Sequence, residues 1–349
     1  MPIRCAFRNT IRKQFPGRHN LKKIISTMNN NILVRRTVPK PTPVFDTYWR
    51  FAAERQNILM KRLARAAWPW TDDPILAKYK FTNVYRVTDR VSQYLVAQVI
   101  GADERDLAST MLRILLFKLF NKIETWELLE DQHGEINART FQAAAIKHTL
   151  DLAVAGGASI YSAAYIMPSG PADVRQTRKH WMHLLLLAGM LANRIPEQLA
   201  AAPTMMKGFA RLREIPGFGP FLAYQYATDL AYSRHFCWDE MEFVEPGPGA
   251  RSGLAKCFEH LGDYSEAETI RLVTESQDDV FERLGLQFQR LWARPLQLID
   301  CQNIFCETDK YARVAHPEMP GIGGRAKIKQ KFVPTAVPAP LVLPRKWQR

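Results

Sequence analysis

Apolar residues recur along most of this chain every three to four positions, which is the spacing of one face of an α-helix. Residues 45–65 show the pattern clearly, with Asp46 expected as the N-cap, and Trp68-Pro-Trp-Thr-Asp-Asp-Pro74 ends it because two prolines cannot continue a helix. Strand-like alternation is scarce, so we expect an all-α fold of two helical lobes with a cleft between them. Further helices are predicted at about 84–100, 105–120, 136–155, 175–193, 204–214, 220–233, 265–286 and 295–313.

Two segments interrupt the helical pattern. Pro246-Gly-Pro-Gly-Ala250 is expected to form a rigid loop, and from Pro317 onward prolines and glycines recur among basic residues. We therefore expect a helical domain at 45–316, between a flexible basic leader at 1–44 and an extended Pro-rich tail at 317–349.

The positive charge is concentrated at the two ends. The 349 residues carry a net charge of +14, yet residues 1–45 and 319–349 contain no Asp or Glu, and the middle is slightly acidic. Basic tails on a nearly neutral body are typical of electrostatic arms that bind a polyanion such as DNA, although they also occur as plain soluble extensions. The leader is in addition similar to an organelle transit peptide, with Met28 as an alternative start.

Composition excludes several classes of protein. No apolar stretch approaches the length of a membrane span, so we expect a soluble protein with no membrane partner. Five cysteines without a Cys-x-x-Cys pair argue against a disulfide framework and against zinc. We therefore expect reduced thiols in an intracellular setting, cytoplasmic or nuclear, with no metal and no cofactor.

The most informative motif is a tight turn between two predicted helices, Leu212-Arg-Glu-Ile-Pro-Gly-Phe-Gly-Pro220. Such a turn and the following helix N-terminus can direct backbone N–H groups at a DNA phosphate, as in a helix–hairpin–helix. The expected DNA-binding residues are Pro216, Gly217, Phe218 and Gly219. The alternative is an ordinary glycine-rich connection between two helices.

An acidic residue follows the turn at a sequence spacing that is typical of a known class of enzymes. Asp239 lies twenty residues after Gly219, the spacing of the catalytic acid in hairpin-containing DNA glycosylases, which act on a base outside the stack. Glu240 and Glu242 are rivals for the role, and a surface acid is the simplest alternative. Phe221 stands where lyase-type members carry a lysine, so a Schiff-base mechanism is not expected.

Two further segments, 69–90 and 300–313, are rich in polar and aromatic residues. Arg86 and Arg90 lie one helical turn apart beside Asp89, a pattern that suits phosphate binding. Trp70, Phe81 and Tyr85 offer stacking surfaces for an extruded base. Asn303, Glu307 and Lys310 share a helix face. The alternative is that these charges form buried ion-pair networks that lock helices together.

These motifs in this order resemble the helical domain of the 5-hydroxymethyluracil DNA kinases. That domain belongs to the DNA-base hypermodification group, which includes the proteins described as glutamyl/putrescinyl-thymine pyrophosphorylases. The likeness runs from about residue 45 into the tail. It is carried by Trp68-Pro-Trp-Thr-Asp-Asp-Pro-Ile-Leu76, Lys80-Phe-Thr-Asn-Val-Tyr-Arg86, Ile215-Pro-Gly-Phe-Gly-Pro-Phe-Leu-Ala-Tyr-Gln225, Gly247-Pro-Gly-Ala-Arg-Ser-Gly253 and Gln302-Asn-Ile-Phe-Cys-Glu-Thr-Asp-Lys-Tyr311.

The resemblance implies a derived helix–hairpin–helix glycosylase fold acting on a 5-substituted uracil or thymine in DNA, with an amine displacing a phosphate or pyrophosphate. The chain has no Gly-x-x-x-x-Gly-Lys-Ser/Thr loop, so it is not expected to be a kinase by itself, and a separate DNA-base kinase or thymine hydroxylase is an expected partner besides DNA. The expected phosphate and base pocket consists of Glu54, Arg55, Thr82, Asn83, Arg86, Asp89, Arg90, Gly247, Gly249, Arg251, Gln302, Asn303, Glu307 and Lys310. Two other functions stay open, a monofunctional DNA glycosylase and a non-catalytic binder of modified DNA.

Overall fold

A computed structural model describes residues 36–101, 105–162, 178–334 and 340–347, and helices account for most of them. The longer helices are α2 (Pro43–Leu63), α5 (Leu107–Phe120), α6 (Ile123–His133), α7 (Ala143–Ala155), α8 (Lys179–Ala192), α10 (Met205–Arg213), α11 (Pro220–Leu230), α12 (Pro248–Cys257), α13 (Glu266–Glu275) and α15 (Leu298–Ala315). Shorter helices are α3 (Pro74–Lys78), η2 (Arg86–Thr88), α4 (Arg90–Tyr94), η3 (Leu95–Ile100), α9 (Ile195–Ala200), α14 (Gln277–Arg283), η5 (Leu291–Ala293) and η6 (Arg345–Trp347). In the described part, β1 (Lys40–Pro41) and β2 (Phe258–His260) form the one small antiparallel sheet, so the helical class is confirmed.

The first helix begins earlier than its hydrophobic pattern indicates. Thr42, not Asp46, is the N-cap of α2, and its hydroxyl accepts a hydrogen bond from the backbone N–H of Val44. Pro43 occupies the first helical position, where a proline loses no hydrogen bond. Asp46 lies in the first turn, and β1 and Thr42 precede the boundary expected at residue 45.

Other boundaries also differ from the prediction. The segment expected as one helix at 84–100 is divided among η2, α4 and η3, and the segment at 265–286 is broken at Ser276 into α13 and α14. The helices α6 and α9 were not expected. The loop predicted around Pro246–Ala250 is in fact the start of α12, because Gly247 serves as its N-cap and Pro248 opens it.

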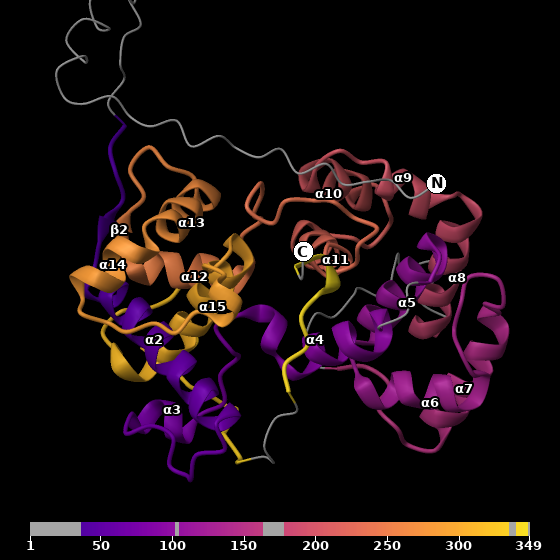
Figure 1. Cartoon of the computed structure of the whole chain (residues 1–349), viewed down its shortest axis with the longest axis horizontal. Helices are drawn as coiled ribbons and strands as arrows, with labels where there is room; N and C mark the ends of the chain where they lie inside the picture. The colour runs from indigo at the N-terminus through magenta and orange to yellow at the C-terminus, as the bar shows by residue number, and fades with distance from the viewer. Residues whose placement is uncertain (1–35, 102–104, 163–177, 335–339, 348–349) are drawn as a thin grey trace, which may run out of the picture.

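Figure 1 shows the described helices in two groups. One group contains α2, α3 and α12 to α15, the other contains α5 to α10, and α4 and α11 lie between them. The three pockets described here are lined by the first group and the C-terminal segment. A glycosylase-like cleft between two lobes therefore stays a prediction.

The tightest helix pair in the first group is α12 with α15. A Cβ on Gly253 would collide with the backbone carbonyl of Phe305, and one on Gly249 would collide with the Sγ atom of Cys306. Glycine at these two positions lets the helix backbones approach closely. This packing fixes two walls, from α12 and α15, of a cavity lined by both helices.

Residues 319–334, which we call the C-terminal strap, pack against this group instead of leaving it. Lys80 donates its backbone N–H to the carbonyl of Gln330 at 3.1 Å, and Phe332 donates to that of Lys78 at 2.9 Å. Gly321 lies so close to Ser252 and Asp309 that no side chain would fit there. The strap is irregular, as expected, but it is anchored at both of these points.

Two expectations from composition can be compared with the structure. Within the described ranges, no helix has the combination of length and apolar character that crossing a bilayer requires. Among the described cysteines, Cys257, Cys301 and Cys306 are free thiols. No cluster of metal ligands occurs among the residues described.

Candidate functional site

The turn at 214–219 joins two packed helices, α10 and α11. Gly217 has a φ of +87°, a left-handed conformation that glycine adopts without strain. Phe218, expected among the DNA-binding residues, is buried against Tyr226 with ring centroids 4.8 Å apart, so its side chain anchors the turn to the body instead of facing outward. Pro216 and Gly217 are exposed, and Gly219 is the N-cap of α11. The structure therefore has a helix, a tight turn and a second helix here, an arrangement that a helix–hairpin–helix and an ordinary connection share.

Part of the turn's hydrogen-bonding capacity is used internally. The N–H of Phe218 donates to the carbonyl of Ile215, and that of Gly219 donates to the carbonyl of Gly217. The remaining attraction for an anion comes from the N-terminus of α11 and from the cations Lys207, Arg211 and Arg213 on α10. DNA binding by this turn stays a prediction.

Asp239 lies away from the described pockets. Its side chain is exposed, and one carboxylate oxygen accepts a hydrogen bond from the N–H of Met241 at 2.8 Å. None of the three pockets contains it. Its rival Glu240 is buried and forms ion pairs with Arg294 and Lys346, and Glu242 accepts a hydrogen bond from the N–H of Met205. This geometry is that of surface and structural acids, and it gives the catalytic role of Asp239 no support.

Other predicted site residues do come together, around the segment before η2. Arg55 donates to the backbone carbonyls of Phe81 and Thr82 and to the Oδ1 atom of Asn83. The N–H of Asn83 donates to Asp89 at 2.8 Å, and the N–H of Thr82 donates to Glu307 at 3.1 Å. The network is completed by Lys310, which lies 2.7 Å from Glu307. Of the predicted set, Arg55, Thr82, Asn83, Asp89, Glu307 and Lys310 are connected.

Burial changes the pKa values of ionisable groups in this network. Removal from water lowers the pKa of the Arg55 guanidinium to about 10, against the opposing attraction of Asp89. Burial likewise raises the pKa of Asp89 to about 6, although the N–H of Asn83 and the charge of Arg55 oppose the change. No acceptor among the described residues reaches the buried Nη1 atom of Arg55.

Arg86 belongs to a different cluster, which is fully buried. Its Nη1 atom lies 2.7 Å from Asp229 on α11, and Asp229 also pairs with Lys118 on α5 at 2.9 Å. Its backbone N–H donates to Asp300 on α15. This arrangement matches the structural alternative, an ion-pair network that ties helices of both groups together. Burial lowers the pKa of Lys118 to about 8, and the two cations hold the pKa of Asp229 below its usual value.

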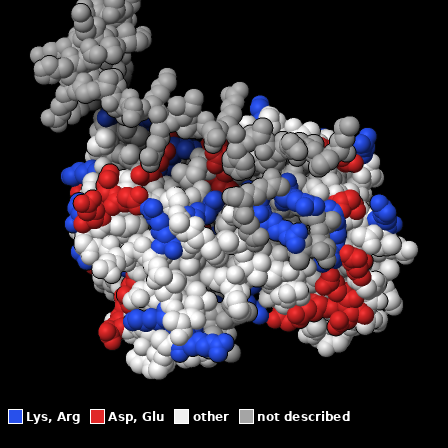
Figure 2. All heavy atoms as spheres, viewed as in Figure 1, with Lys and Arg blue, Asp and Glu red and all other residues white. Residues whose placement is uncertain are grey.

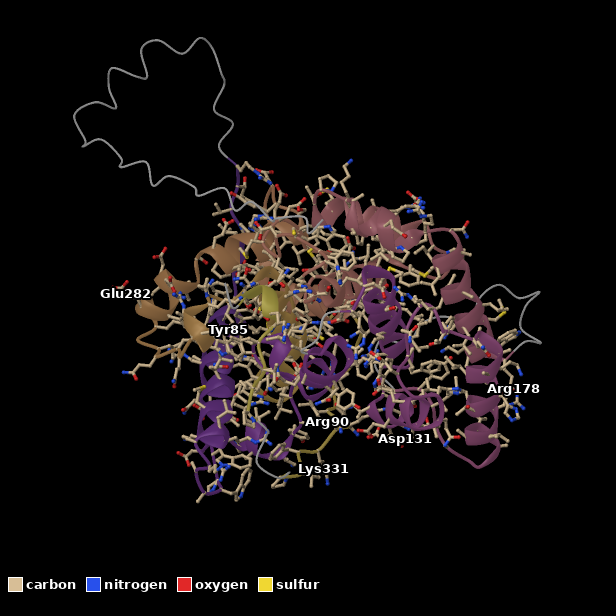
Figure 3. The ribbon with its side chains drawn as sticks, turned by 45° about the vertical axis from the view of Figure 1, so that its right-hand side comes forward. Tyr85, Arg90, Asp131, Arg178, Glu282 and Lys331 are labelled. Atoms are coloured by element: carbon tan, nitrogen blue, oxygen red, sulfur yellow. The ribbon has the colours of Figure 1, made fainter. Side chains whose placement is uncertain are left out.

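Arg90, four residues later, has the opposite environment. Its side chain is 74% exposed and lies 3.8 Å from Glu124, which is itself exposed. Figure 3 shows Tyr85 on the side of α2 and Arg90 nearer to Asp131 and α6. Tyr85 is buried and donates its hydroxyl to the carbonyl of Arg294, so it does not line the pockets. The pair of arginines therefore does not act on one ligand.

The largest of the three cavities, which we call the basic hollow, has a volume of about 950 Å³. It lies between α15, the N-terminus of α12 and the strap. Its cations outnumber its acids, and one of those acids, Asp309, is already satisfied by Ser252, Lys256 and Arg313. The charged residues that line it are Glu307, Asp309, Lys310, Arg313, Arg325, Lys327 and Lys329.

The first turn of α12 borders this hollow. Pro248 and Gly249 line it, and a Cβ on Gly247 would collide with the ring of Phe221 at the start of α11. Gln302 is buried beside Gly247, and its Oε1 atom has no hydrogen-bond partner among the described residues. Arg251 is directed elsewhere, toward Glu245 and Glu266.

The remaining predicted residues lie apart from the hollow. Asn303 is half-buried on α15. Glu54 accepts a hydrogen bond from the hydroxyl of Thr71 and lines a separate cavity with Arg50 and Gln289.

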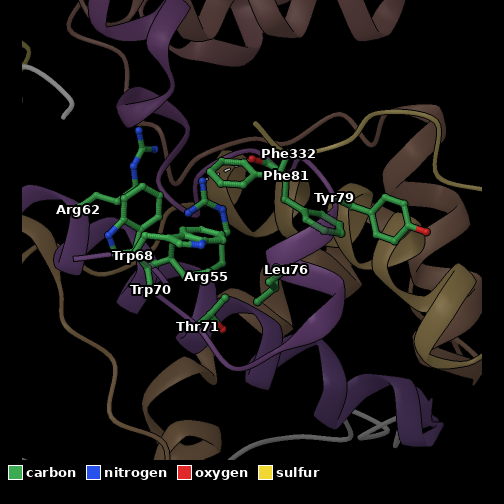
Figure 4. Close-up of a pocket in the computed structure, with 10 residues that line it drawn as sticks. Arg55, Arg62, Trp68, Trp70, Thr71, Leu76, Tyr79, Phe81 and Phe332 are labelled. Carbon is green, nitrogen blue, oxygen red and sulfur yellow. Dashed lines mark hydrogen bonds between the residues drawn. The ribbon is translucent and has the colours of Figure 1, made fainter. Parts of the chain in front are cut away.

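A second, smaller cavity of about 20 Å³ lies next to the hollow, and we call it the aromatic pocket. Figure 4 shows its ring and guanidinium side chains gathered around one space. Trp70 and Phe81, predicted as stacking surfaces, both line it. Its lining residues are Arg55, Ile58, Arg62, Trp68, Trp70, Thr71, Leu76, Tyr79, Phe81 and Phe332.

Charge is unevenly distributed over the molecule. On the face in Figure 2, Lys and Arg gather at the lower edge near α3 and again in the region of α11 and α5, whereas Asp and Glu gather over α6 and at the left edge near α14. The strap meets Lys78 and Lys80 after α3. A polyanion on this face would be attracted to the basic groups and repelled by α6.

Sequence reasoning missed several of these residues. Trp68 and Phe332 meet only because the strap returns to the segment after α3. Ser252, Asp309 and Arg313 form a cluster whose one local signal is the four-residue spacing of Asp309 and Arg313 on a helix. Another available signal is the alternation in Arg325-Ala-Lys-Ile-Lys-Gln-Lys331, since an extended segment places every second side chain on one side.

Comparison with known proteins defines the class of this chain. Residues 42–321 match the family described as "5-hmdU DNA kinase, helical domain", and the chain belongs to that family. It is 27% identical over 309 residues to a 5-hmdU DNA kinase of Bacillus phage SP10, an alignment that covers 83% of this chain. The chain spans about half, 48%, of that relative's length. No solved structure matches.

Proposed function

We propose that this protein is a DNA-modifying enzyme that acts on an extruded 5-substituted uracil or thymine, where a phosphorylated substituent is displaced by an amine. The proposal is supported above all by a basic hollow that lies within the family's helical domain and is bordered by the motifs that carry the resemblance. Because the relative is about twice as long as the matched region, its kinase activity is not transferred to this chain.

The DNA backbone would be held on the outside of the molecule. The exposed turn at Pro216 and Gly217 presents the N-terminus of α11, with Arg213 beside it, since its guanidinium donates to the carbonyl of Phe218. On the other side, the strap offers exposed cations at every second position from Arg325 to Lys331. Such contacts position a strand without reading its sequence.

The phosphorylated substituent would enter the basic hollow. Lys310, Arg313 and Lys327 supply positive charge, and the N-terminus of α12 adds partial charge and backbone donors. In the reaction, the amine nitrogen forms a bond to the exocyclic methylene carbon. The carbon–oxygen bond breaks at the same carbon, and the phosphate leaves with the electron pair, stabilised by these cations.

The amine must also lose a proton. Glu307 is the carboxylate at the inner wall of the hollow, held by Lys310 and the N–H of Thr82, and we propose that it accepts this proton. Gln302 and Asn303 on the same helix would then bind the base edge or the amine. Asp239 remains a prediction for this role, and its exposed position makes it the weaker candidate.

The test is a direct assay for the modified nucleoside. DNA that carries 5-phosphoryloxymethyluracil or 5-pyrophosphoryloxymethyluracil is incubated with the full chain and a panel of amines, and its nucleosides are analysed by mass spectrometry. We expect an amine-substituted thymine, lost in Glu307→Gln and reduced in Lys310→Gln. Glu318→Gln, at an exposed position outside the hollow, is the matched control.

Other products would identify the alternatives. Abasic sites that disappear in Asp239→Asn would indicate a glycosylase. Tight binding of the modified DNA with unchanged nucleosides across all amines would indicate a non-catalytic binder and would refute the transferase proposal.

A further inference from the structure

We propose that the aromatic pocket is a binding site for the planar ring of the extruded pyrimidine, and that Phe332 of the strap occupies the place of this ring in the structure. The inference rests on the proposed function and deepens it, because it separates the site of the ring from the site of the phosphate. Phenyl and pyrimidine rings are both flat six-membered rings of similar size, so one can replace the other.

The surroundings of Phe332 are those that a flat aromatic ligand requires. Trp68 stacks on it with centroids 5.8 Å apart and an interplanar angle of 21°, and Trp70 meets it edge-on at 6.2 Å and 73°. These are the favoured arrangements of aromatic pairs, and they are the ones that bases form with aromatic side chains. Phe332 is half-buried and Trp68 is 46% exposed, so the stack is reachable from solvent.

The pocket also contains a polar group that lacks an acceptor. Arg55 lines the pocket, its side chain is 9% exposed, and its buried Nη1 atom has no hydrogen-bond partner among the described residues. A phenyl ring offers no acceptor, whereas uracil and thymine carry two exocyclic oxygens. A pyrimidine in place of Phe332 would therefore give Arg55 the acceptor that it lacks.

The contacts that keep Phe332 in place are confined to a few neighbouring residues. Besides the ring contacts, they consist of one isolated antiparallel bridge, Tyr79 with Lys331, which is formed by the two backbone hydrogen bonds between residues 330–332 and 78–80. No regular helix or strand would have to break for this residue to leave. Displacement of the ring is therefore compatible with an otherwise unchanged fold.

The aromatic pocket and the basic hollow share a wall. Lys310 lines the hollow, Phe81 lines the pocket, and the Nζ atom of Lys310 lies 4.6 Å from the centroid of the Phe81 ring. The strap borders both spaces, with Lys327 and Lys329 at the hollow and Phe332 at the pocket. A base in the pocket thus lies beside a site for the charged group on its 5-position.

Photochemical cross-linking tests the inference at residue level. A DNA duplex with one 5-iodouracil is irradiated with the full chain, and the cross-linked peptide is identified by mass spectrometry. We expect the cross-link at Trp68, Trp70 or Phe81. Phe332→Ala, which removes the competing ring, should raise the yield several-fold, whereas Val333→Ala, at a 70% exposed neighbour, should leave it unchanged.

Affinity gives a second measurement on the same variants. Trp68→Ala removes one stacking contact with the base, so it should weaken binding of the 5-iodouracil duplex about tenfold. Binding is measured by fluorescence anisotropy at fixed salt. Binding of the unmodified duplex through its backbone should change less. A cross-link outside the pocket in DNA that binds, or a lower yield in Phe332→Ala, would overturn the inference.

A third arm separates this inference from the proposed function. Free 5-iodo-2′-deoxyuridine is irradiated with Phe332→Ala in the absence of DNA. Labelling of Trp68 or Trp70 when the duplex itself does not bind would uphold a ring site and refute a DNA enzyme. Absence of labelling by both probes would refute the ring site as well.

Discussion

The buried cluster of Arg86, Asp229 and Lys118 gives the sharpest prediction about the body of the protein. Asp229 is fully buried and is the partner of both cations, at 2.7 and 2.9 Å. Asp229→Asn removes the negative charge but almost no volume, and it takes from two buried cations the carboxylate that both of them contact. Breaking one partner out of a buried ion pair costs about 3–5 kcal/mol, because the remaining charge has lost its solvent as well as its partner.

With an entropy of unfolding of about 2.1 cal/mol/K per residue, that loss corresponds to a Tm about 4–7 °C lower for this chain length. The free energy of unfolding is measured by urea titration with circular dichroism, in low and in high salt. Because the cluster is buried, the loss should persist at high ionic strength. Glu124→Gln, which removes the exposed partner of Arg90, is the control and should change stability by less than about 0.5 kcal/mol.

The same experiment decides between the two interpretations of Arg86. Arg86→Lys keeps the charge but loses the planar fork that contacts Gln225, Asp229 and Tyr232, so we expect lower stability and an unchanged salt dependence of DNA binding. A phosphate ligand would behave in the opposite way, with stability preserved and the slope of log K against log salt reduced by about 0.9. Asp229→Asn as stable as the original protein within 1 kcal/mol would refute our account of the cluster.

Three further predictions concern pH and glycine. Burial raises the pKa of Asp300 to about 6 from 3.8, so the native state binds this proton more tightly than the unfolded state. The free energy of unfolding, measured by urea titration, should therefore fall by up to about 3 kcal/mol as pH rises from 4 to 6. In the control Asp300→Asn, this part of the pH dependence should be missing. Gly217→Ala, at a φ of +87°, should lower the free energy of unfolding by about 1–2 kcal/mol and weaken DNA binding in fluorescence anisotropy. Pro216→Ala should retain the turn and is the control. Equal DNA affinity of the two variants would contradict the role of the turn. Gly253→Ala should lower stability by about 3 kcal/mol because its Cβ meets the carbonyl of Phe305, and the exposed Ala255→Ser on the same helix should have little effect in the same thermal melts.

Local sequence patterns predicted the features whose causes are local. The turn at Gly217 and the helices around it follow from residues within a few positions of one another, and the helix of Asn303, Glu307 and Lys310 was placed within three residues of its observed ends. Errors arose where two local signals compete. Pro246–Ala250 looks like a loop, yet glycine as N-cap and proline at the first position are also an efficient helix start.

Features that depend on the environment in three dimensions were not accessible from the sequence. Arg86 and Arg90 have the same residue type and similar neighbours in sequence, but one is 2% exposed and the other 74%. Their difference arises from Asp229, more than 130 positions away. The contact of Phe332 with Trp68 depends likewise on a pairing between chain segments about 250 residues apart, which no helical periodicity records.

The cluster of Arg86, Asp229 and Lys118 also has a consequence for how a base would be reached. Because Arg86 connects α15 to α11 through buried charges, a hinge motion between the two groups of helices would expose or separate ions at a cost of several kcal/mol each. In the proposed encounter with DNA, the duplex must then supply most of the deformation, while the two groups of helices keep their relative position. Preference among target sites would follow the flexibility of the surrounding base steps, greatest at pyrimidine–purine steps, even where no side chain contacts those bases.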